Sequence, residues 1–280
     1  MIAHNFVIDV LEYLRLVQYT KEQVWDYESA QISCPVIIPE PLETSYQHVL
    51  QSRYSTKPQL IEKEENEHHS ISLAIFPKQK QTVKGNWTVK VKPIVQNKLE
   101  PITSVRNFQD NAYISSTDPR IVALKNRIVS SGDSALVQTR KLYNFVLSYL
   151  EYKNPIMGLY SYEEAFEKRQ VDCGGFCTLL ASLLASVHIS SSFAVGFLKT
   201  VTPPYAAMHV WLEIHMKDGS IFPLDPSVDW RRRKGISRRW GGFGYIGSDR
   251  VVVSYGTDIF LTIHGKKMHF PIVQHPVNFD

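Results

Sequence analysis

One segment of the 280-residue chain restricts its fold more than any other, the stretch CGGFCTLLASLLASV that begins at Cys173. Its apolar residues follow the i, i+3, i+4, i+7 pattern, which predicts an unbroken helix buried along one face. The segments that follow are typical of strands and are separated by Pro, Gly and Asp. These segments cover residues 192–199, 208–216, 220–225, 250–256 and 258–265. We therefore expect an α+β fold in which one helix packs on an antiparallel sheet.

The region before this helix has a different pattern. Residues 30–105 carry clusters of β-forming residues punctuated by Pro, Gly and Lys, which predicts an antiparallel β region. Apolar residues at helical spacing within residues 1–20 favour a helix there. We accordingly divide the chain into an N-terminal region, 1–105, with a small β-sandwich-like domain, and a core, 106–280.

Helices dominate between these two β-rich parts. Asp118 and Pro119 predict the cap and the first residue of one helix, and residues 133–151 predict a longer one. The sequence SYEEAF has the form of a capping box, in which Ser161 caps a short helix and Glu164 reaches back to it.

Composition narrows the class of protein. The net charge of +4 is spread over 31 basic and 27 acidic residues, so we expect no nucleic-acid partner. The apolar stretch FVIDVLEYLRLV is interrupted by Asp9, Glu12 and Arg15, and no run is long enough to span a bilayer, so we expect no membrane association. Three cysteines form no disulfide framework, which favours a reducing, cytoplasmic location. The arginine-rich segment 231–244 is expected to be a mobile loop.

Cys173 is the candidate nucleophile because it stands where its helix begins. Unpaired N–H groups at a helix start are expected to lower the pKa of a thiol, and the Cys173 amide could hold an oxyanion. Gly174 and Gly175 would let a substrate backbone approach, and Gln170 is a further candidate oxyanion donor. Cys177 lies one turn deeper beside the apolar ridge, so we assign it to the core.

A nucleophilic cysteine needs a base, and the base needs a partner that orients it. Strand periodicity places His209, Trp211 and Glu213 on one face of the segment MHVWLEIHM. Asp225 ends the next strand-like segment, where its carboxylate can face an imidazole on the neighbouring strand. Cys173, His209 and Asp225 are therefore the candidate triad.

These residues occur in the runs VDCGGFCTLLASLLASVHISSSFAVGF and MHVWLEIHMKDGSIFPLDPS, which resemble the transglutaminase-like cysteine enzymes. That family has a helix-starting Cys, a His in an HxWxE strand and an Asp in a DP turn. The resemblance implies a papain/transglutaminase-like core with Cys173, His209 and Asp225 as the catalytic triad, supported by Trp211 and Glu213. The stretch VHISSS departs from the family's usual sequence after the helix, and the acidic calcium-binding cluster of the animal cross-linking enzymes is missing.

The resemblance and the chemistry together imply acyl transfer through a thioester on Cys173. We expect a cysteine protease or amidase that acts on peptide or glutamine-type amides, without a cofactor. A transglutaminase-type amine acyltransferase and a non-catalytic binding module that retains the fold remain alternatives. A zinc site of Cys173, Cys177, His209 and His215 fits common ligand spacings poorly, so no metal is expected.

Overall fold

The computed structural model describes most of the chain from residue 36 onward. The described ranges are 36–54, 57–65, 69–76, 85–102, 110–199, 206–263, 265–275 and 277–278. The helix predicted within residues 1–20 and the third cysteine, Cys34, lie outside these ranges. In the described part of the chain, no helix is both long and apolar enough to cross a membrane.

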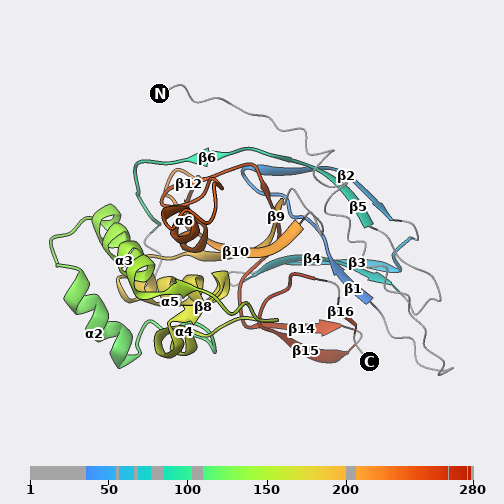
Figure 1. Ribbon diagram of the computed structural model, residues 1–280. Helices are drawn as coiled ribbons and strands as arrows, with labels where there is room; N and C mark the ends of the chain where they lie inside the picture. The colour runs from blue at the N-terminus through green and yellow to red at the C-terminus, as the bar shows by residue number, and fades with distance from the viewer. Residues whose placement is uncertain are drawn as a thin grey trace.

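An eight-stranded sheet forms the centre of the fold (Figure 1). Its strands pair in the order β11, β10, β9, β13, β4, β1, β16, with β3 on β4, and every pair is antiparallel. Their bounds are β1 Val36–Pro39, β3 Leu60–Glu65, β4 Ser70–Phe76, β9 Ser192–Lys199, β10 Ala206–His215, β11 Ile221–Leu224, β13 Arg250–Tyr255 and β16 Val277–Asn278. The strands predicted after the Cys173 helix are confirmed.

Among the described residues there are also four two-stranded ladders, and only the last of those named below is parallel. They are β2 Gln47–Tyr54 with β5 Gly85–Val91, β14 Ile259–Ile263 with β15 Lys266–Phe270, β6 Ile94–Val95 with β12 Tyr245–Ile246, and β7 Glu151–Tyr152 with β8 Gln170–Val171. The described strands of the predicted N-terminal β region are antiparallel, as expected.

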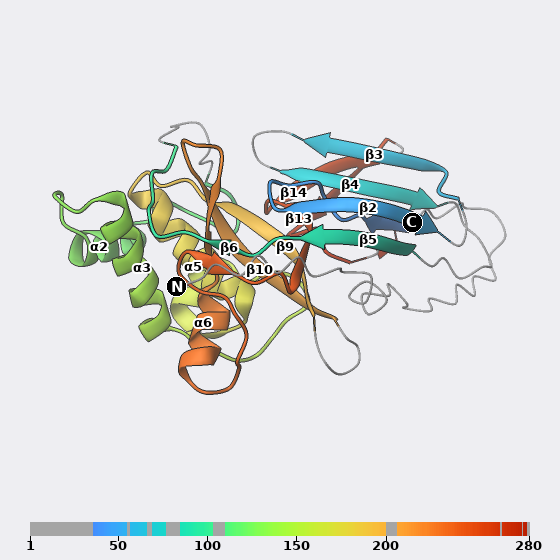
Figure 2. The same ribbon diagram turned by 90° about the horizontal axis from the view of Figure 1, so that it is seen from above.

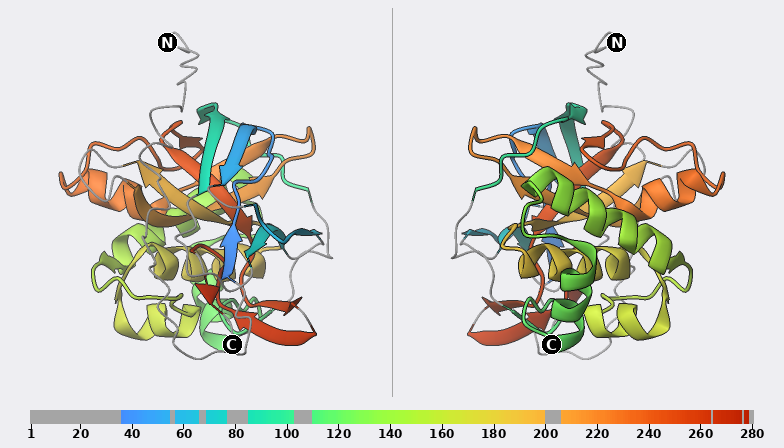
Figure 3. Two further views of the ribbon diagram at one scale, coloured as in Figure 1. Left: turned by 90° about the vertical axis from the view of Figure 1, so that its right-hand side faces the viewer. Right: turned by 90° about the vertical axis from the view of Figure 1, so that its left-hand side faces the viewer.

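Five helices lie in the described part of the chain. They are α2 Pro119–Ile128, α3 Ala135–Tyr149, α4 Tyr162–Lys168, α5 Cys173–Ser186 and α6 Pro226–Arg233. The predicted cap at Asp118 and the predicted capping box of Ser161 and Glu164 are both present. Helices α2, α3 and α6 gather at one end of the molecule and strands β2 to β5 at the other (Figure 2). Seen from the helical end, α2 and α3 lie in front of the sheet (Figure 3).

Side-chain alternation along β10 separates the two faces of the sheet. Val210, Leu212 and Ile214 share an apolar cluster with the buried leucines of α5. Trp211 instead belongs to a cluster with Trp87 of β5. Burial of each leucine side chain contributes about 1.5 to 3 kcal/mol, so the leucine ridge of α5 fixes this helix on the sheet. The predicted packing of one helix on an antiparallel sheet is confirmed.

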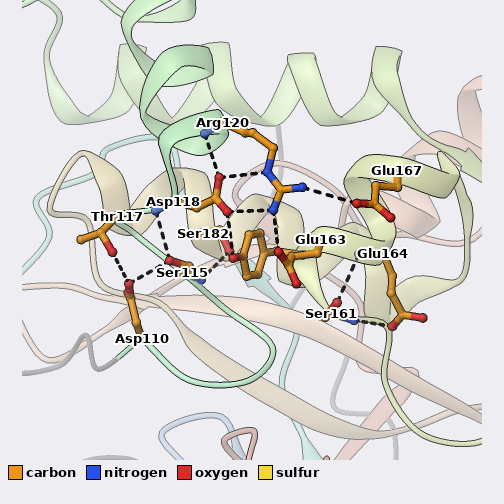
Figure 4. Close-up of polar contacts among 11 residues, drawn as sticks. Asp110, Ser115, Thr117, Asp118, Arg120, Ser161, Glu163, Glu164, Glu167 and Ser182 are labelled. Carbon is orange, nitrogen blue, oxygen red and sulfur yellow. Dashed lines mark hydrogen bonds and ion pairs between the residues drawn. The ribbon is translucent and has the colours of Figure 1, made fainter.

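A polar network fastens the segment before α2 to the other helices (Figure 4). Arg120 of α2 binds its cap residue Asp118 at 2.8 Å and Glu163 of α4 at 2.6 Å. The backbone N–H of Ser115 donates to the hydroxyl of Ser182 on α5 at 3.1 Å. The network therefore ties α2 and α4 to the helix that begins at Cys173.

The predicted domain boundary at residue 105 does not coincide with a break in the sheet. Strand β4 from the N-terminal region pairs with β13 from the core. The side chain of Gln47, which is fully buried, accepts from the Val252 N–H at 2.8 Å and donates to the carbonyl oxygens of Val252 and Leu42 at 2.8 and 2.7 Å. A side chain from the N-terminal region thus completes the hydrogen bonding of a core strand.

Replacing Gln47 should reveal this dependence. Gln47→Leu leaves the buried Val252 N–H without this acceptor, whereas the Val252 carbonyl oxygen still accepts from the Leu42 N–H at 3.1 Å. An unsatisfied buried donor costs about 1 to 3 kcal/mol. We expect the free energy of unfolding, measured by chemical denaturation, to fall by at least about 1 kcal/mol. Gln51→Leu, on the exposed side of the same strand, is the matched control and should leave stability nearly unchanged. Equal losses in the two variants would contradict this role of Gln47.

Candidate active site

Helix α5 begins at Cys173 because the preceding residue, Asp172, caps it. One carboxylate oxygen of Asp172 accepts from the N–H groups of Gly174 and Gly175 at 2.9 and 3.4 Å. The other accepts from the Ile156 N–H at 3.1 Å. Asp172 therefore fixes both the helix start and the loop that faces it.

The two glycines are required by packing inside the protein. A Cβ atom on Gly174 would lie 2.7 Å from the side chain of Leu159, and one on Gly175 would lie 2.5 Å from the side chain of Val171. The space beside them is therefore already filled by the protein. Packing therefore accounts for both glycines; Gly174 lines the cavity at Cys173, where a substrate backbone is expected, and Gly175 does not.

The thiol of Cys173 does not have the lowered pKa that its place at a helix start predicted. Burial raises its pKa to about 12, and the nearby carboxylates of Asp172 and Asp225 add to the rise, while the N–H groups of Val210 and Gly174 oppose it. Because Asp172 occupies the amides of the first turn, little of the helix dipole is left for a thiolate. The resting thiol is protonated at neutral pH, so its attack requires a base.

His209 and Asp225 form a buried pair. Strand β10 carries His209 and the end of β11 leads into Asp225, which places Nε2 of the imidazole 3.0 Å from Oδ2 of the carboxylate. His209 is 5% exposed and Asp225 is fully buried. An ionised carboxylate accepts the Nε2 proton, so Nδ1 is the nitrogen that carries the lone pair. The pair thus presents a base rather than a second donor.

Asp225 is held by more than the imidazole. Arg250 of β13 donates from Nη1 to the same oxygen, Oδ2, at 2.6 Å. The other oxygen caps α6 by accepting from the Val228 N–H at 3.2 Å. Burial opposes ionisation of Asp225, but His209 and Arg250 outweigh it and hold the pKa of this carboxyl well below its usual range. The Asp225 carboxylate is therefore ionised at neutral pH and can orient the imidazole of His209.

Arg250 was not anticipated from the sequence. Its side chain is fully buried, donates to the Trp240 carbonyl oxygen at 3.0 Å and lies 5.2 Å above the ring of Trp211. Buried arginines are rare and need a compensating charge, here supplied by Asp225 and, at 3.5 Å, by Asp249. The available signal was one charged residue opening the otherwise apolar strand RVVVSY.

Trp211 and Glu213 support this cluster from behind. The ring of Trp211 stacks on that of His209 with centroids 5.9 Å apart, and its Nε1 donates to Glu213 at 2.8 Å. Glu213 is fully buried and also accepts from the hydroxyls of Tyr46 and Tyr255. Burial raises the pKa of Glu213, and these three hydrogen bonds oppose the rise. Glu213 thus orients Trp211, and Trp211 packs against the imidazole.

The segment 231–244, expected to be a mobile loop, is ordered around Asp225. Residues 231–233 belong to α6, whose start at Asp225 and Pro226 repeats the signature recognised at the start of α2. Gly241 is buried, and a Cβ atom there would lie 3.1 Å from the Asp225 carboxylate and 3.0 Å from the Arg250 guanidinium. The expectation of a loop is wrong for residues 231–233, which are helical, and the backbone at Gly241 packs directly on the ion pair.

Cys173 and His209 line the same cavity of about 400 Å³. No hydrogen bond joins the two side chains among the described residues, and catalytic hydrogen bonds often tighten only when substrate binds. Gln170 does not line this cavity and donates instead to Glu151 at 2.9 Å. Gln170 is therefore not brought to the thiol, and no described residue before 105 lines the cavity.

Cys177 and His215, the other two residues considered for a zinc site, do not line this cavity. Cys177 is fully buried in the apolar core, with its sulfur 3.6 Å from the Val210 carbonyl oxygen. His215 is an exposed residue at the end of β10 and contacts Ser192 at 2.8 Å. Within the described ranges, no group of three or more His, Cys, Asp or Glu side chains could hold a metal ion.

Removing one partner of the Asp225–Arg250 pair should destabilise the fold. Asp225→Asn or Arg250→Met leaves an uncompensated buried charge or acceptor, so each should lower the free energy of unfolding by about 3 to 5 kcal/mol. The double variant should be more stable than either single variant. Since the pKa of Asp225 is lowered in the folded state, its contribution is present above its unfolded pKa of about 3.9 and is lost as the pH falls below that value.

The original protein, the two single variants and the double variant are denatured at pH 7 and at lower pH. These measurements give both the coupling between Asp225 and Arg250 and the pH dependence of stability. Glu65→Gln, an exposed residue at the end of β3, is the control and should resemble the original protein throughout. Strictly additive losses in the double variant would show that Asp225 and Arg250 are not coupled.

Comparison with known proteins finds a family model that matches part of the chain. Residues 122–226 match the family model of the transglutaminase-like superfamily. Comparison with curated protein sequences finds no match. The structure resembles that of a "Putative Cysteine Protease" from Cytophaga hutchinsonii, with a TM-score of 0.55 and 15% identity over 90% of this chain and 84% of that chain. The periplasmic domain of TgpA from Pseudomonas aeruginosa aligns with a TM-score of 0.40 and 14% identity over 75% of this chain and 94% of that chain.

The family match spans α2 to the first residue of α6 and includes all three candidate triad residues. The likeness to the Cytophaga hutchinsonii structure, at this identity, concerns the fold and extends beyond the matched segment. The predicted fold class is therefore confirmed. The resemblance inferred from the sequence is confirmed as well, because residues 122–226 match the family model of the transglutaminase-like superfamily.

Proposed function

We propose that this protein is a cysteine hydrolase that cleaves peptide amides through a thioester on Cys173. One observation carries the proposal: Cys173 and His209 line one cavity, while the far nitrogen of His209 is fixed on Asp225. The imidazole is thus buried, oriented and supplied with a permanent negative charge, as a general base requires.

The chemistry follows from the protonation states. Nδ1 of His209 takes the proton of the Cys173 thiol as the sulfur attacks the carbonyl carbon. The imidazolium, stabilised by Asp225, then gives this proton to the leaving amine as the carbon–nitrogen bond breaks. Water, activated by the same imidazole, next attacks the thioester, and the acid and the free thiol are released.

The amide of Cys173 is the donor we assign to the oxyanion. In the first turn of α5, Asp172 accepts the N–H groups of Gly174, Gly175 and Phe176 through its side chain and its carbonyl oxygen. The Cys173 N–H is the remaining donor of that turn. A preorganised donor at the nucleophile stabilises the charge that develops on the carbonyl oxygen.

Hydrolysis is preferred over transfer to an amine because water needs no binding site of its own. Assay of peptide cleavage with and without methylamine separates the two: an acid product supports hydrolysis, and a methylamide product identifies an amine acyltransferase. Absence of any turnover that depends on Cys173 would favour a binding module.

Three variants separate catalysis from packing. Cys173→Ser retains the volume and the helix start but loses a good nucleophile, so turnover should vanish with little change in melting temperature. His209→Ala should also abolish turnover. Cys177→Ser places a hydroxyl in the apolar core and should cost about 1 to 3 kcal/mol, with activity per folded molecule retained.

Melting temperature and peptide hydrolysis are measured for each variant. The two cysteines form a matched pair, because the same substitution is made one helical turn apart. Normal turnover by Cys173→Ser, or an inactive but folded Cys177→Ser, would contradict the assignment.

A further inference from the structure

The cavity at Cys173 has mainly apolar walls. One wall is the loop 155–159, and the opposite wall comes from β10 and the segment 270–275. Most of the lining side chains are apolar, among them Ile156, Met157 and Met208. These three are 38%, 69% and 44% exposed, so the apolar walls are accessible to a ligand.

Besides the Cys173 and His209 pair, the ionisable groups of the lining are Asp172, His275 and Tyr152. No Lys or Arg side chain lines the cavity, and Asp172 is its single carboxylate. Both oxygens of Asp172 already accept backbone N–H groups. Gln274 donates to the carbonyl oxygens of Gly196 and His209 at 2.5 and 3.1 Å. A negatively charged side chain in the cavity would face no Lys or Arg, and a positively charged one would face a single carboxylate that is already hydrogen-bonded. Either would therefore lose water with little compensation.

We propose that this cavity selects peptides by a bulky apolar side chain next to the scissile amide and rejects charged side chains there. The inference rests on the proposed function. A cavity of about 400 Å³ lies at the lower end of the roughly 300 to 1,000 Å³ typical of ligand pockets, so it suits one or two side chains rather than a long segment. Met157 and Met208, which are flexible and polarisable, adapt to leucine, methionine or phenylalanine alike.

Five peptides test the proposal. They are identical except for the residue on the acyl side of one scissile amide, which is Leu, Phe, Gly, Glu or Lys. We expect kcat/KM for Leu and Phe to exceed that for Gly by about 10-fold or more, since each buried methylene is worth about 10- to 200-fold. Glu and Lys should be slower still.

A charge placed in the wall should reverse part of this preference. Met157→Glu should lower kcat/KM for the Leu peptide and raise it for the Lys peptide, which narrows the ratio between them at least about tenfold. Phe260→Glu, an equally exposed apolar residue of β14 outside the cavity, is the matched control and should change neither value.

Hydrolysis of p-nitrophenyl acetate, an ester without side chains, separates this inference from the proposed function. Ester hydrolysis that needs Cys173, combined with equal cleavage of all five peptides or with a preference for the charged ones, would overturn the inference alone. Absence of peptide cleavage would overturn the proposed function as well, even if the ester is hydrolysed. Loss of both ester and peptide hydrolysis would overturn the proposed function and the inference with it.

Discussion

The arrangement depends on one buried oxygen atom, Oδ2 of Asp225. His209 and Arg250 both bind it, at 3.0 and 2.6 Å, in a part of the protein that water does not reach. A buried carboxylate with a single neutral partner would tend to protonate and would then no longer orient the imidazole. Arg250 prevents this because its charge is permanent.

The surrounding elements are built to keep this oxygen in place. The second carboxylate oxygen starts α6, and the backbone at Gly241 packs on the ion pair. Trp211 contacts both the His209 ring and the Arg250 guanidinium. Glu213 holds Trp211 and is itself bound by Tyr46 from the N-terminal region. The β-rich region therefore contributes to the site through positioning, although none of its described residues lines the cavity.

At Cys173 the surroundings disfavour the charged form, whereas at Asp225 they favour it. Asp172 starts α5 with its carboxylate, and in doing so it uses the amides that would otherwise stabilise a thiolate. Burial and this negative charge raise the pKa of Cys173 to about 12. In the proposed mechanism, the thiol remains protonated until a bound substrate brings Nδ1 of His209 into use. A protonated thiol reacts more slowly with other electrophiles.

Local sequence patterns predicted the three candidate triad residues better than the residues that hold them in place. The helix at Cys173, the strand of His209 and the turn at Asp225 each have a signature confined to a few residues, so the sequence alone located them. Arg250 follows Asp225 by 25 positions, and only the pairing of β13 with β9 brings it close. Gln170 failed as a candidate because its strand directs the amide to Glu151. The helix α6 was missed although Asp225 and Pro226 carry the same start signal as Asp118 and Pro119.

In the proposed function, acyl transfer passes through the sulfur of Cys173. The most direct test is intact-mass spectrometry of the protein quenched in acid during turnover of an activated peptide ester, followed by peptide mapping. We expect an acyl adduct on Cys173 that disappears as product forms and is absent from Cys173→Ser. Product formation with no adduct on Cys173, or an adduct on Cys177, would contradict it.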